Sequence, residues 1–440
     1  MKNNALRTAM KKKNRLITFF VSFAMLLLFL SSADARVYLD ITSADFRKIP
    51  MAVPYFEDKS RPGTSSEAGK EMADIMSRAL TFHGFISVIP PLKYGGKQNF
   101  NWQALGAEFT ILGQYNSSPS GIILELRLLD IHEGRMITGK RYRGTQDKYR
   151  QMLYKFCDEA ILKLTGERGI SLTKIAYVSD KAGSREVFIS DILGDETRQV
   201  TYHGNLTVSP RFSPDGAKLA YTSYHRDNPD LYVTDLTQFR TTKAISFRPG
   251  LNLAPAWSPD GKTMAVTLMS IDDTPDIYLM NTKGDILKRL TANAGINVSA
   301  SWSPDGRQLA FVSDRSGTPQ IYVMNLKTRS VRRITFYGND NSTPSWSPKG
   351  EWIAYTGRYN GNLHIFIIKP EQGKPVQLTR FWGNHESPSW SPDGRQIVFS
   401  RLRNEKQELC AIFKNSTGYR PIFRLKGKQS YPQWSPRLKL

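Results

Sequence analysis

The stretch Ser301-Trp302-Ser303-Pro304-Asp305-Gly306 decides the fold, because near copies of it recur along the second half of the chain. Copies with the same Ser-Pro centre stand at 211–216, 256–261, 345–350 and 389–394, and a truncated copy stands at 433–436. The serine before the proline recurs at steps of 45, 45, 44, 44 and 44 residues. A constant period of this length indicates stacked supersecondary units.

Each repeat contains the same order of turns and apolar runs. Ser-Pro-Asp-Gly predicts a tight turn, because Pro presets φ, Asp bonds nearby backbone and Gly accepts a positive φ. Alternating apolar runs follow, such as Leu309–Val312 and Gln320–Met324, and a third run ends in a Leu/Ile-Thr pair such as Ile334-Thr335. With the strand before Ser-Pro, each period predicts four short strands, the size of one propeller blade.

The number of repeats predicts six blades over residues 169–440. The first repeat, from Lys174, lacks the Ser-Pro turn, and the last, at Trp434, retains little beyond it. We expect these two halves to complete one blade, so that the carboxyl end closes the ring and leaves no open sheet edge. The Trp-Ser-Pro-Asp-Gly residues are interpreted as turn and core residues without chemistry of their own.

Two segments precede the repeats. Residues 1–35 combine a basic start, an apolar run of 15 residues at 16–30 and small residues before Arg36, which is typical of a secretory signal peptide beginning at Met1 or Met10. Residues 36–168 alternate apolar strands with two helical patterns, one ending at His83-Gly84 and one at Thr165-Gly166. They predict an α/β domain with a mixed sheet and two helices, exported to the periplasm with the propeller.

The formal net charge is +22, and removal of residues 1–35 would leave +17. Such a surplus suggests anionic partners. Nucleic acid is disfavoured because an exported protein seldom meets it and because the basic residues are spread over every repeat. We expect Cys157 and Cys410 to be separate buried thiols, since they lie in different predicted domains.

A search for catalytic patterns favours a protein without enzymatic activity. No Gly-x-Ser-x-Gly elbow and no His-Glu-x-x-His pattern occurs, and the six histidines show no metal-ligand spacing. We therefore expect no catalytic residue, no metal and no cofactor. Asp272, Asp273 and Asp276 could hold a cation, but a solvated turn is the preferred interpretation.

The loops before the Ser-Pro turns are the better candidates for function. Each begins with Gly, and five of the six continue with Asn or apolar residues, as in Gly250–Leu253 and Gly295–Val298; the sixth is Gly427–Ser430. Ring symmetry would place all six loops on one face, and apolar side chains among Asn suit a binding rim on a rigid scaffold. The alternative is that Gly and Asn serve only the turns.

The whole pattern resembles the TolB family, the periplasmic component of the Tol-Pal system. The likeness rests on the signal peptide, an α/β domain of about 130 residues and six repeats built on Trp-Ser-Pro-Asp-Gly. It covers the whole chain after residue 35. It implies a non-enzymatic adaptor that contributes to outer-membrane integrity and to constriction during cell division.

The resemblance also implies partners and contact residues. In that family the propeller docks the Pal lipoprotein at the mouth of its channel, and the matching positions here are Leu251, Asn252, Leu253, Ile296, Asn297, Val298, Asn341, Ser342, His385 and Glu386. The first mature residues contact the inner-membrane protein TolA and switch between free and tucked positions. The matching segment here is Arg36, Val37, Tyr38, Leu39, Asp40 and Ile41.

Two other classes of function stay open at this point. One is a small-ligand propeller with a site in the channel, which would show carboxylates or histidines converging at equivalent strand starts. The other is a protein that binds peptidoglycan or another polysaccharide.

Overall fold

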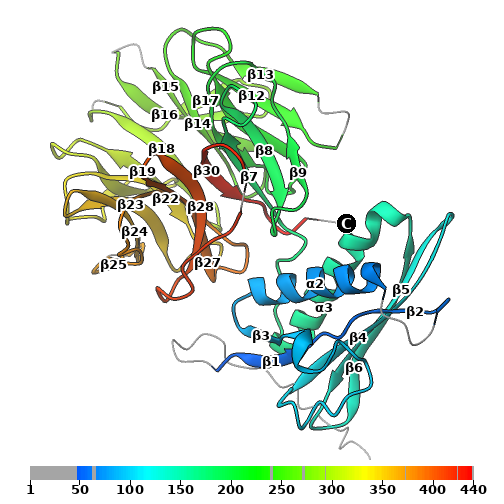
Figure 1. Cartoon of the computed structure of the whole chain (residues 1–440). Helices are drawn as coiled ribbons and strands as arrows, with labels where there is room; N and C mark the ends of the chain where they lie inside the picture. Colours follow the sequence, from blue (N-terminus) through cyan, green and yellow to red (C-terminus); the bar gives the residue numbers. More distant parts are fainter. Residues whose placement is uncertain are drawn as a thin grey trace, which may run out of the picture. The chain divides into compact units, whose positions relative to one another are not determined.

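The computed structural model describes residues 47–61, 66–237, 241–269, 273–292, 294–371, 373–423 and 425–438. The expected signal peptide and the segment Arg36–Ile41 lie outside the described residues. The described residues form one compact unit, in which an α/β domain precedes a six-bladed β-propeller (Figure 1). The predicted fold class, a mixed sheet with two helices followed by six blades, is therefore confirmed.

The α/β domain contains a six-stranded mixed sheet with the order β3-β1-β4-β5-β6, in which β2 also pairs with β4. Strands β1, β2 and β3 make parallel pairings, whereas β4, β5 and β6 run antiparallel to one another. The strands are β1 (Ile49–Ala52), β2 (Glu57–Asp58), β3 (Ile86–Ile89), β4 (Phe109–Ser118), β5 (Gly121–Asp130) and β6 (Arg135–Gly144). The helices are α2 (Glu67–Phe82) and α3 (Tyr149–Thr165), with short 3-10 turns η1 (Pro91–Lys93) and η2 (Gln146–Lys148).

Local sequence signals explain where the helices begin and end. The Ser66 hydroxyl accepts a hydrogen bond from the backbone N–H of Gly69, 3.0 Å away, and so caps the start of α2. Gly166 ends α3 in the left-handed conformation, with φ of 74°. The helices pack on each other, α2 also against β3 and α3 against β5 and β6, so their apolar faces bury one side of the sheet.

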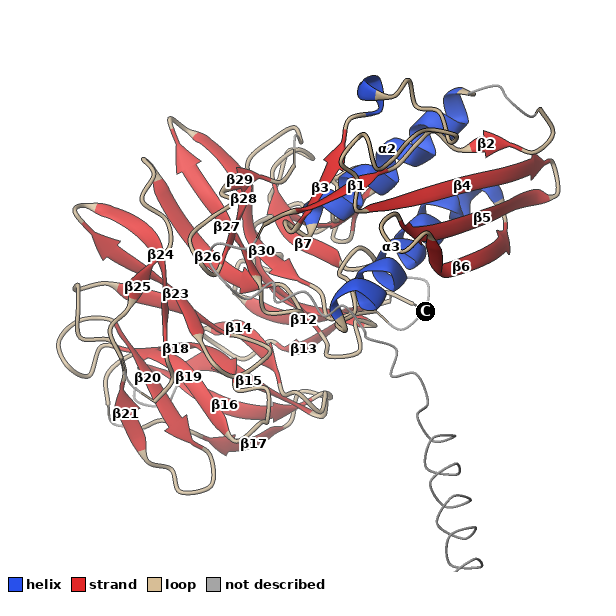
Figure 2. Ribbon diagram, turned by 90° about the horizontal axis from the view of Figure 1, so that it is seen from below, coloured by secondary structure: helices blue, strands red, loops and turns tan. Residues whose placement is uncertain are grey.

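The described propeller residues form six antiparallel sheets of four strands each (Figure 2). Blade 1 is β30 (Gln429–Trp434), β7 (Lys174–Ser179), β8 (Glu186–Asp191) and β9 (Thr197–Gln199). Blade 2 is β10 (Thr207–Phe212), β11 (Lys218–Ser223), β12 (Asp230–Asp235) and β13 (Thr242–Ser246). Blade 3 is β14 (Asn252–Trp257), β15 (Thr263–Met269), β16 (Pro275–Asn281) and β17 (Ile286–Arg289).

The remaining blades follow in chain order. Blade 4 is β18 (Asn297–Trp302), β19 (Gln308–Ser313), β20 (Gln320–Asn325) and β21 (Val331–Arg333). Blade 5 is β22 (Asn341–Trp346), β23 (Ile353–Tyr359), β24 (Asn362–Ile368) and β25 (Val376–Gln377). Blade 6 is β26 (Asn384–Trp390), β27 (Gln396–Arg403), β28 (Lys406–Phe413) and β29 (Arg420–Pro421).

The carboxyl-terminal strand closes the ring, as the repeat pattern predicts. Strand β30 pairs antiparallel with β7, and Trp434 lies opposite Ile175 in the register. The Trp434 indole N–H donates to the Thr173 hydroxyl oxygen at 2.8 Å, which joins residues 261 positions apart. Blade 1 is therefore assembled from both ends of the propeller sequence.

Six apolar clusters hold the blades together, and each lies between two neighbouring blades. The cluster between blades 6 and 1 also contains Phe82 from helix α2, whose ring meets Trp434 edge-on at 5.9 Å. The core of the ring thus extends into the α/β domain. Burial of this kind supplies most of the stability of such a fold.

Three of the repeated tryptophans, Trp257, Trp302 and Trp390, fasten their blade to the preceding one. The Trp302 indole N–H donates to the Ala256 carbonyl at 2.9 Å, and the Trp390 indole N–H donates to the Ser345 carbonyl at 3.0 Å. Trp257 makes the equivalent bond to Arg211. Each acceptor lies 45 or 46 residues earlier in the chain, which is one repeat. This contact explains why the repeat places Trp beside the Ser-Pro turn.

The Ser-Pro-Asp-Gly turn is held by its own side chains. In the copy at 303–306, the Ser303 hydroxyl donates to the Asp305 carboxylate at 2.6 Å and the Arg307 N–H donates to the same oxygen at 3.0 Å. Gly306 has φ of 70°. The copy at 347–350 has Lys349 in place of Asp, and Lys349 instead forms an ion pair with Glu167 of the segment after α3, at 2.7 Å.

Each innermost strand carries a β-bulge that the repeat analysis missed. One residue per blade has φ between 48° and 58°, and the pairing register shifts around it; these residues are Ser209, Ala254, Ser299, Thr343, Ser387 and Tyr431. A proline follows in five of the six blades, where a bulge tolerates the missing N–H. The bend therefore recurs at the same level around the ring.

Candidate functional site

The two faces of the propeller differ in what they present. Because each blade is an antiparallel meander, the Ser-Pro turns and the turns before the fourth strands share one face, called here the Ser-Pro face. The loops between blades and the hairpins between second and third strands share the opposite face, called here the loop rim. Its interblade loops are the described residues of 200–206, 247–251, 290–296, 334–340, 378–383 and 422–428.

The α/β domain contacts turns of the Ser-Pro face. Glu167 bonds Lys349 and Arg395, which both belong to Ser-Pro turns, at 2.7 and 3.1 Å. Asp195, in the turn between β8 and β9, pairs with Arg78 of α2 at 2.6 Å and with Arg150 of α3 at 2.7 Å. Burial would raise the pKa of Asp195, but the two guanidinium groups hold it below its ordinary value. The contacts named here leave the loop rim to other molecules.

Four of the predicted contact residues are buried, and three of them, all asparagines, hold the rim loops in place through hydrogen bonds. The Asn297 amide donates to the Asp276 carboxylate at 2.9 Å and to the Gly295 carbonyl at 2.8 Å. The Asn341 amide donates in the same way to the Gln320 amide oxygen and to the Tyr337 carbonyl, both at 2.9 Å. Asn252 bonds the carbonyls of its own loop, and His385 is fully buried.

The other predicted contact residues lie nearer the surface. Ile296 is the most exposed of them, with 46% of its surface accessible. Leu251, Leu253, Val298, Ser342 and Glu386 are half-buried. Burial raises the pKa of Glu386; Arg358 opposes this effect and Asp340 adds to it. The structure thus divides the predicted set into buried side chains that shape the loops and accessible ones that a partner could touch.

The prediction overlooked a group of exposed aromatic side chains on the same rim. They follow the Leu/Ile-Thr or equivalent pair that ends a repeat, and each is between 45% and 71% exposed: Tyr202, Phe247, Phe336, Tyr337, Phe381 and Trp382. Arg333 and Arg403 lie over the rings of Phe336 and Trp382, at 5.0 and 5.1 Å. Aromatic and arginine side chains dominate binding energy at protein interfaces, so these residues extend the candidate site. The recurring position after Thr is the sequence signal that could have found them.

The chemistry of the rim suits binding. No group of three or more His, Cys, Asp or Glu side chains in the described ranges is arranged to hold a metal ion. The Asp276 carboxylate already accepts hydrogen bonds from Arg289, Thr291 and Asn297.

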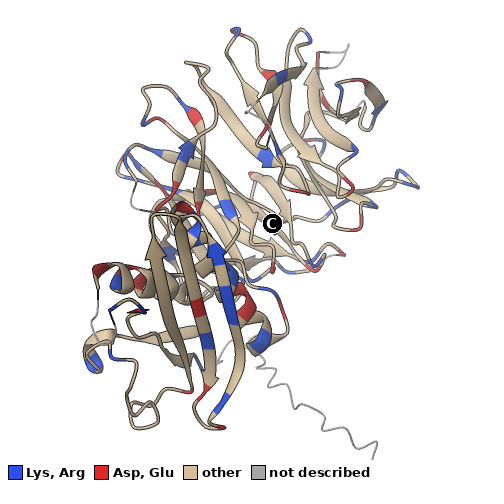
Figure 3. Cartoon of the chain, turned by 90° about the vertical axis from the view of Figure 1, so that its right-hand side faces the viewer, with Lys and Arg blue, Asp and Glu red and all other residues tan. Residues whose placement is uncertain are grey.

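The cysteines lie elsewhere. Cys157 and Cys410 are buried free thiols, as expected, and burial raises the pKa of each. Lys and Arg are spread over the blades and the α/β domain alike (Figure 3).

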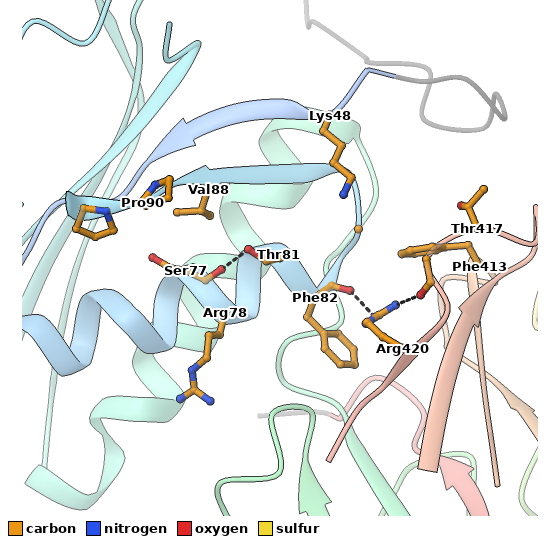
Figure 4. A pocket seen from close by; sticks show the side chains of 13 residues that line it. Lys48, Ser77, Arg78, Thr81, Phe82, Val88, Pro90, Phe413, Thr417 and Arg420 are labelled. Carbon is orange, nitrogen blue, oxygen red and sulfur yellow. Dashed lines mark hydrogen bonds between the residues drawn. The ribbon is translucent and has the colours of Figure 1, made fainter. Parts of the chain in front are cut away.

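One cavity at the domain junction lies between helix α2 and blade 6 (Figure 4). It measures about 730 Å³ and is lined by Phe82, Val88, Pro90 and Phe413 together with Arg420. The Arg420 guanidinium donates to the Phe82 carbonyl at 3.1 Å and to the Gln396 amide oxygen at 2.6 Å. Burial lowers the pKa of Arg420 to about 10. These bonds make Arg420 part of the connection between the domains.

Two family models match the chain. The model described as the TolB beta propeller domain matches residues 161–438, and the model described as the TolB amino-terminal domain matches residues 37–137. Among the described residues, none of the helices is long and apolar enough to cross a membrane.

Individual relatives agree with these models. The chain is 48% identical over 212 residues to the Tol-Pal system protein TolB of Desulfotalea psychrophila, which covers 48% of each chain, and 36% identical over 216 residues to that of Desulfosudis oleivorans, which covers 47% of this chain and 49% of the relative. In these matches the chain spans about half the length of its relatives. The crystal structure of TolB from Acinetobacter baumannii superposes with a TM-score of 0.75 at 27% identity, covering 89% of this chain and 97% of that one.

Proposed function

Because the chain belongs to the TolB family of the Tol-Pal system, we propose that it acts in the periplasm as a non-enzymatic adaptor that docks the Pal lipoprotein on the loop rim. Through this contact it would contribute to outer-membrane integrity and to constriction during cell division. Residues 1–35 would serve as the signal peptide.

The observation that carries the proposal is the combination of exposed aromatics with rigid loops. The buried amides of Asn252, Asn297 and Asn341 hold three of the interblade loops in defined positions before any partner arrives. Loops that are ordered in advance lose little conformational entropy on binding, so more of the contact energy appears as affinity. The exposed Ile296 and the aromatic side chains then supply the apolar contact surface.

We further propose that residues 36–41 contact TolA and that their release is coupled to docking on the rim. If the segment has two positions and a partner binds better to the protein in one of them, docking of that partner shifts the population towards that position. Deletion of residues 36–41 followed by measurement of the Pal affinity tests the coupling. An unchanged affinity would reject it.

The proposed function is tested by purifying the tagged protein from envelope extracts with and without digestion of the cell wall. We expect Pal to be retained after digestion, because the contact is between proteins. Loss of every specific partner on digestion would favour a polysaccharide ligand and contradict the proposal.

A further inference from the structure

A second cavity, of about 540 Å³, lies on blade 5 and reaches from Tyr337 of the loop rim to Lys374 in the turn before the outer strand β25. The stacked rings of Tyr355 and Phe366, 5.5 Å apart, contribute to its lining from the two middle strands of the blade. Tyr337 joins it from the loop before blade 5, and Tyr359 joins it from the end of β23. Both of these tyrosines are more than half exposed, at 63% and 53%. The cavity therefore presents aromatic surface to solvent.

The charged residues that line this cavity are all cationic: Arg358, Lys374 and Arg380. Arg358 already bonds Asp340, at 2.9 Å. Lys374 and Arg380 are exposed and have no acidic partner in the described parts of the chain. An aromatic surface beside two uncompensated cations complements a ligand that combines carboxylates with apolar side chains.

We propose that this cavity binds an acidic segment of the protein that docks on the loop rim, with carboxylates paired to Lys374 and Arg380 and an apolar side chain against Tyr337 and Tyr359. The inference rests on the proposed function, which it extends by assigning a subsite and the chemistry of the partner.

Continuity with the rim favours a protein segment as the occupant. The carbonyl of Tyr337 accepts a hydrogen bond from the amide of Asn341, so the tyrosine is held by the same bond that orders the rim loop. Phe336, its neighbour on the rim, is also exposed. Phe336 is next to Tyr337 in the chain, and Tyr337 lines the cavity. A partner that covers Phe336 on the rim therefore lies beside the cavity.

The test compares two charge-reversal variants of the whole protein. Lys374→Glu with Arg380→Glu alters the cavity, whereas Lys283→Glu with Lys327→Glu alters two exposed lysines in turns of the Ser-Pro face on blades 3 and 4. Both variants change the net charge equally. The affinity for the soluble domain of Pal is measured for each at low and high salt.

We expect the cavity variant to lose at least tenfold in affinity at low salt and the control variant to lose less than threefold. Equal binding by both variants would overturn the subsite and leave Pal docking intact. If the unaltered protein does not bind Pal, the proposed function fails. In that case, binding to the cavity is measured with two capped hexapeptides. One alternates glutamate and phenylalanine, and the other has glutamine in place of each glutamate.

Selective binding of the acidic hexapeptide, lost in the cavity variant and kept in the control, would support the subsite independently of Pal. Binding of soluble peptidoglycan fragments at the cavity without binding of the acidic peptide would overturn it in favour of a glycan. Replacement of Tyr337 by Ala should weaken acidic-peptide binding without changing its salt dependence, because the phenol ring contributes apolar contact.

Discussion

The imidazole rings of His364 and His385 stack between blades 5 and 6, with centroids 5.6 Å apart and planes inclined by 20°. The corresponding pair between blades 4 and 5 is Gln320 and Asn341, which are joined by a hydrogen bond of 2.9 Å. His385 has no hydrogen-bond partner for either ring nitrogen in the described structure, and it is completely buried. One blade junction therefore replaces a bonded amide pair with two titratable rings.

This junction predicts acid sensitivity. Burial, as the largest cause, together with the neighbouring His364 and Arg401 lowers the pKa of His385 to about 4. Burial also lowers the pKa of His364. In the unfolded chain both rings take up protons near their ordinary value of about 6.5, so their contribution to stability is complete above that pH and is lost as the pH falls towards 4.

The double variant His364→Gln/His385→Asn recreates the pair found at the preceding junction. We expect it to lose less stability than the unaltered protein between pH 7.5 and pH 5, by about 1–3 kcal/mol in urea unfolding. His132→Gln, an exposed change in the α/β domain, serves as the control. Identical pH dependence in all three proteins would show that the stacked pair carries no such effect.

The ion pair between Lys349 and Glu167 predicts that the stability effects of substitutions at these two positions are coupled. Lys349→Asp restores the aspartate found in the other complete turns but places it against Glu167, which Lys349 now pairs at 2.7 Å. We expect the substitution to be stabilising when Glu167 is first changed to Gln, and neutral or destabilising when Glu167 is intact. A double-mutant cycle in urea should give a coupling of about 1 kcal/mol. Additive effects would contradict the assignment.

The interblade tryptophan predicts a difference between two conservative substitutions. Trp302→Phe removes the indole donor from the Ala256 carbonyl and should cost about 1–2 kcal/mol, since the buried carbonyl loses its partner. Trp382→Phe, at a rim residue that is 59% exposed, should change stability by less than about 0.5 kcal/mol. The measurement is the free energy of unfolding of both variants. An equal loss of stability in the two would argue against a role of Trp302 in holding neighbouring blades together.

The closing strand predicts that the two ends of the propeller depend on each other. Trp434→Ala removes a buried ring that contacts Phe82 and bonds Thr173, and it should cost about 3–5 kcal/mol. Amide exchange should then accelerate in β7 as well as in β30, because β30 is the pairing partner of β7 on one side. Faster exchange confined to β30 would contradict the shared blade.

Much of the fold could be predicted because its signals are local and repeated. The 44- or 45-residue spacing of Ser-Pro turns predicts the blades, and the lone Trp434 turn predicts the closing strand. The start of α2 and the end of α3 carry their own caps in Ser66 and Gly166. These features can be predicted without knowing which residues that are distant in the sequence contact each other.

The rim was harder to predict because its side chains are satisfied by the preceding blade. Asn297 looks like an available polar group in sequence, but its partner Asp276 lies 21 residues earlier and meets it only after the blades are placed. Asn341 finds Gln320 over the same separation. The exposed aromatics were missed for the opposite reason, since a single Phe or Tyr after Thr resembles any core residue until its exposure is known.

The most direct test of docking on the loop rim compares two isoleucines, Ile286 and Ile296, which are similarly exposed and ten residues apart in the sequence. Ile296 lies on the loop rim and is 46% exposed, whereas Ile286 lies on the outer strand β17 of blade 3 and is 42% exposed. We predict that Ile296→Asp weakens binding of the soluble Pal domain at least tenfold and that Ile286→Asp leaves it unchanged. Undiminished binding by Ile296→Asp, or an equal loss in both variants, would contradict docking on the loop rim.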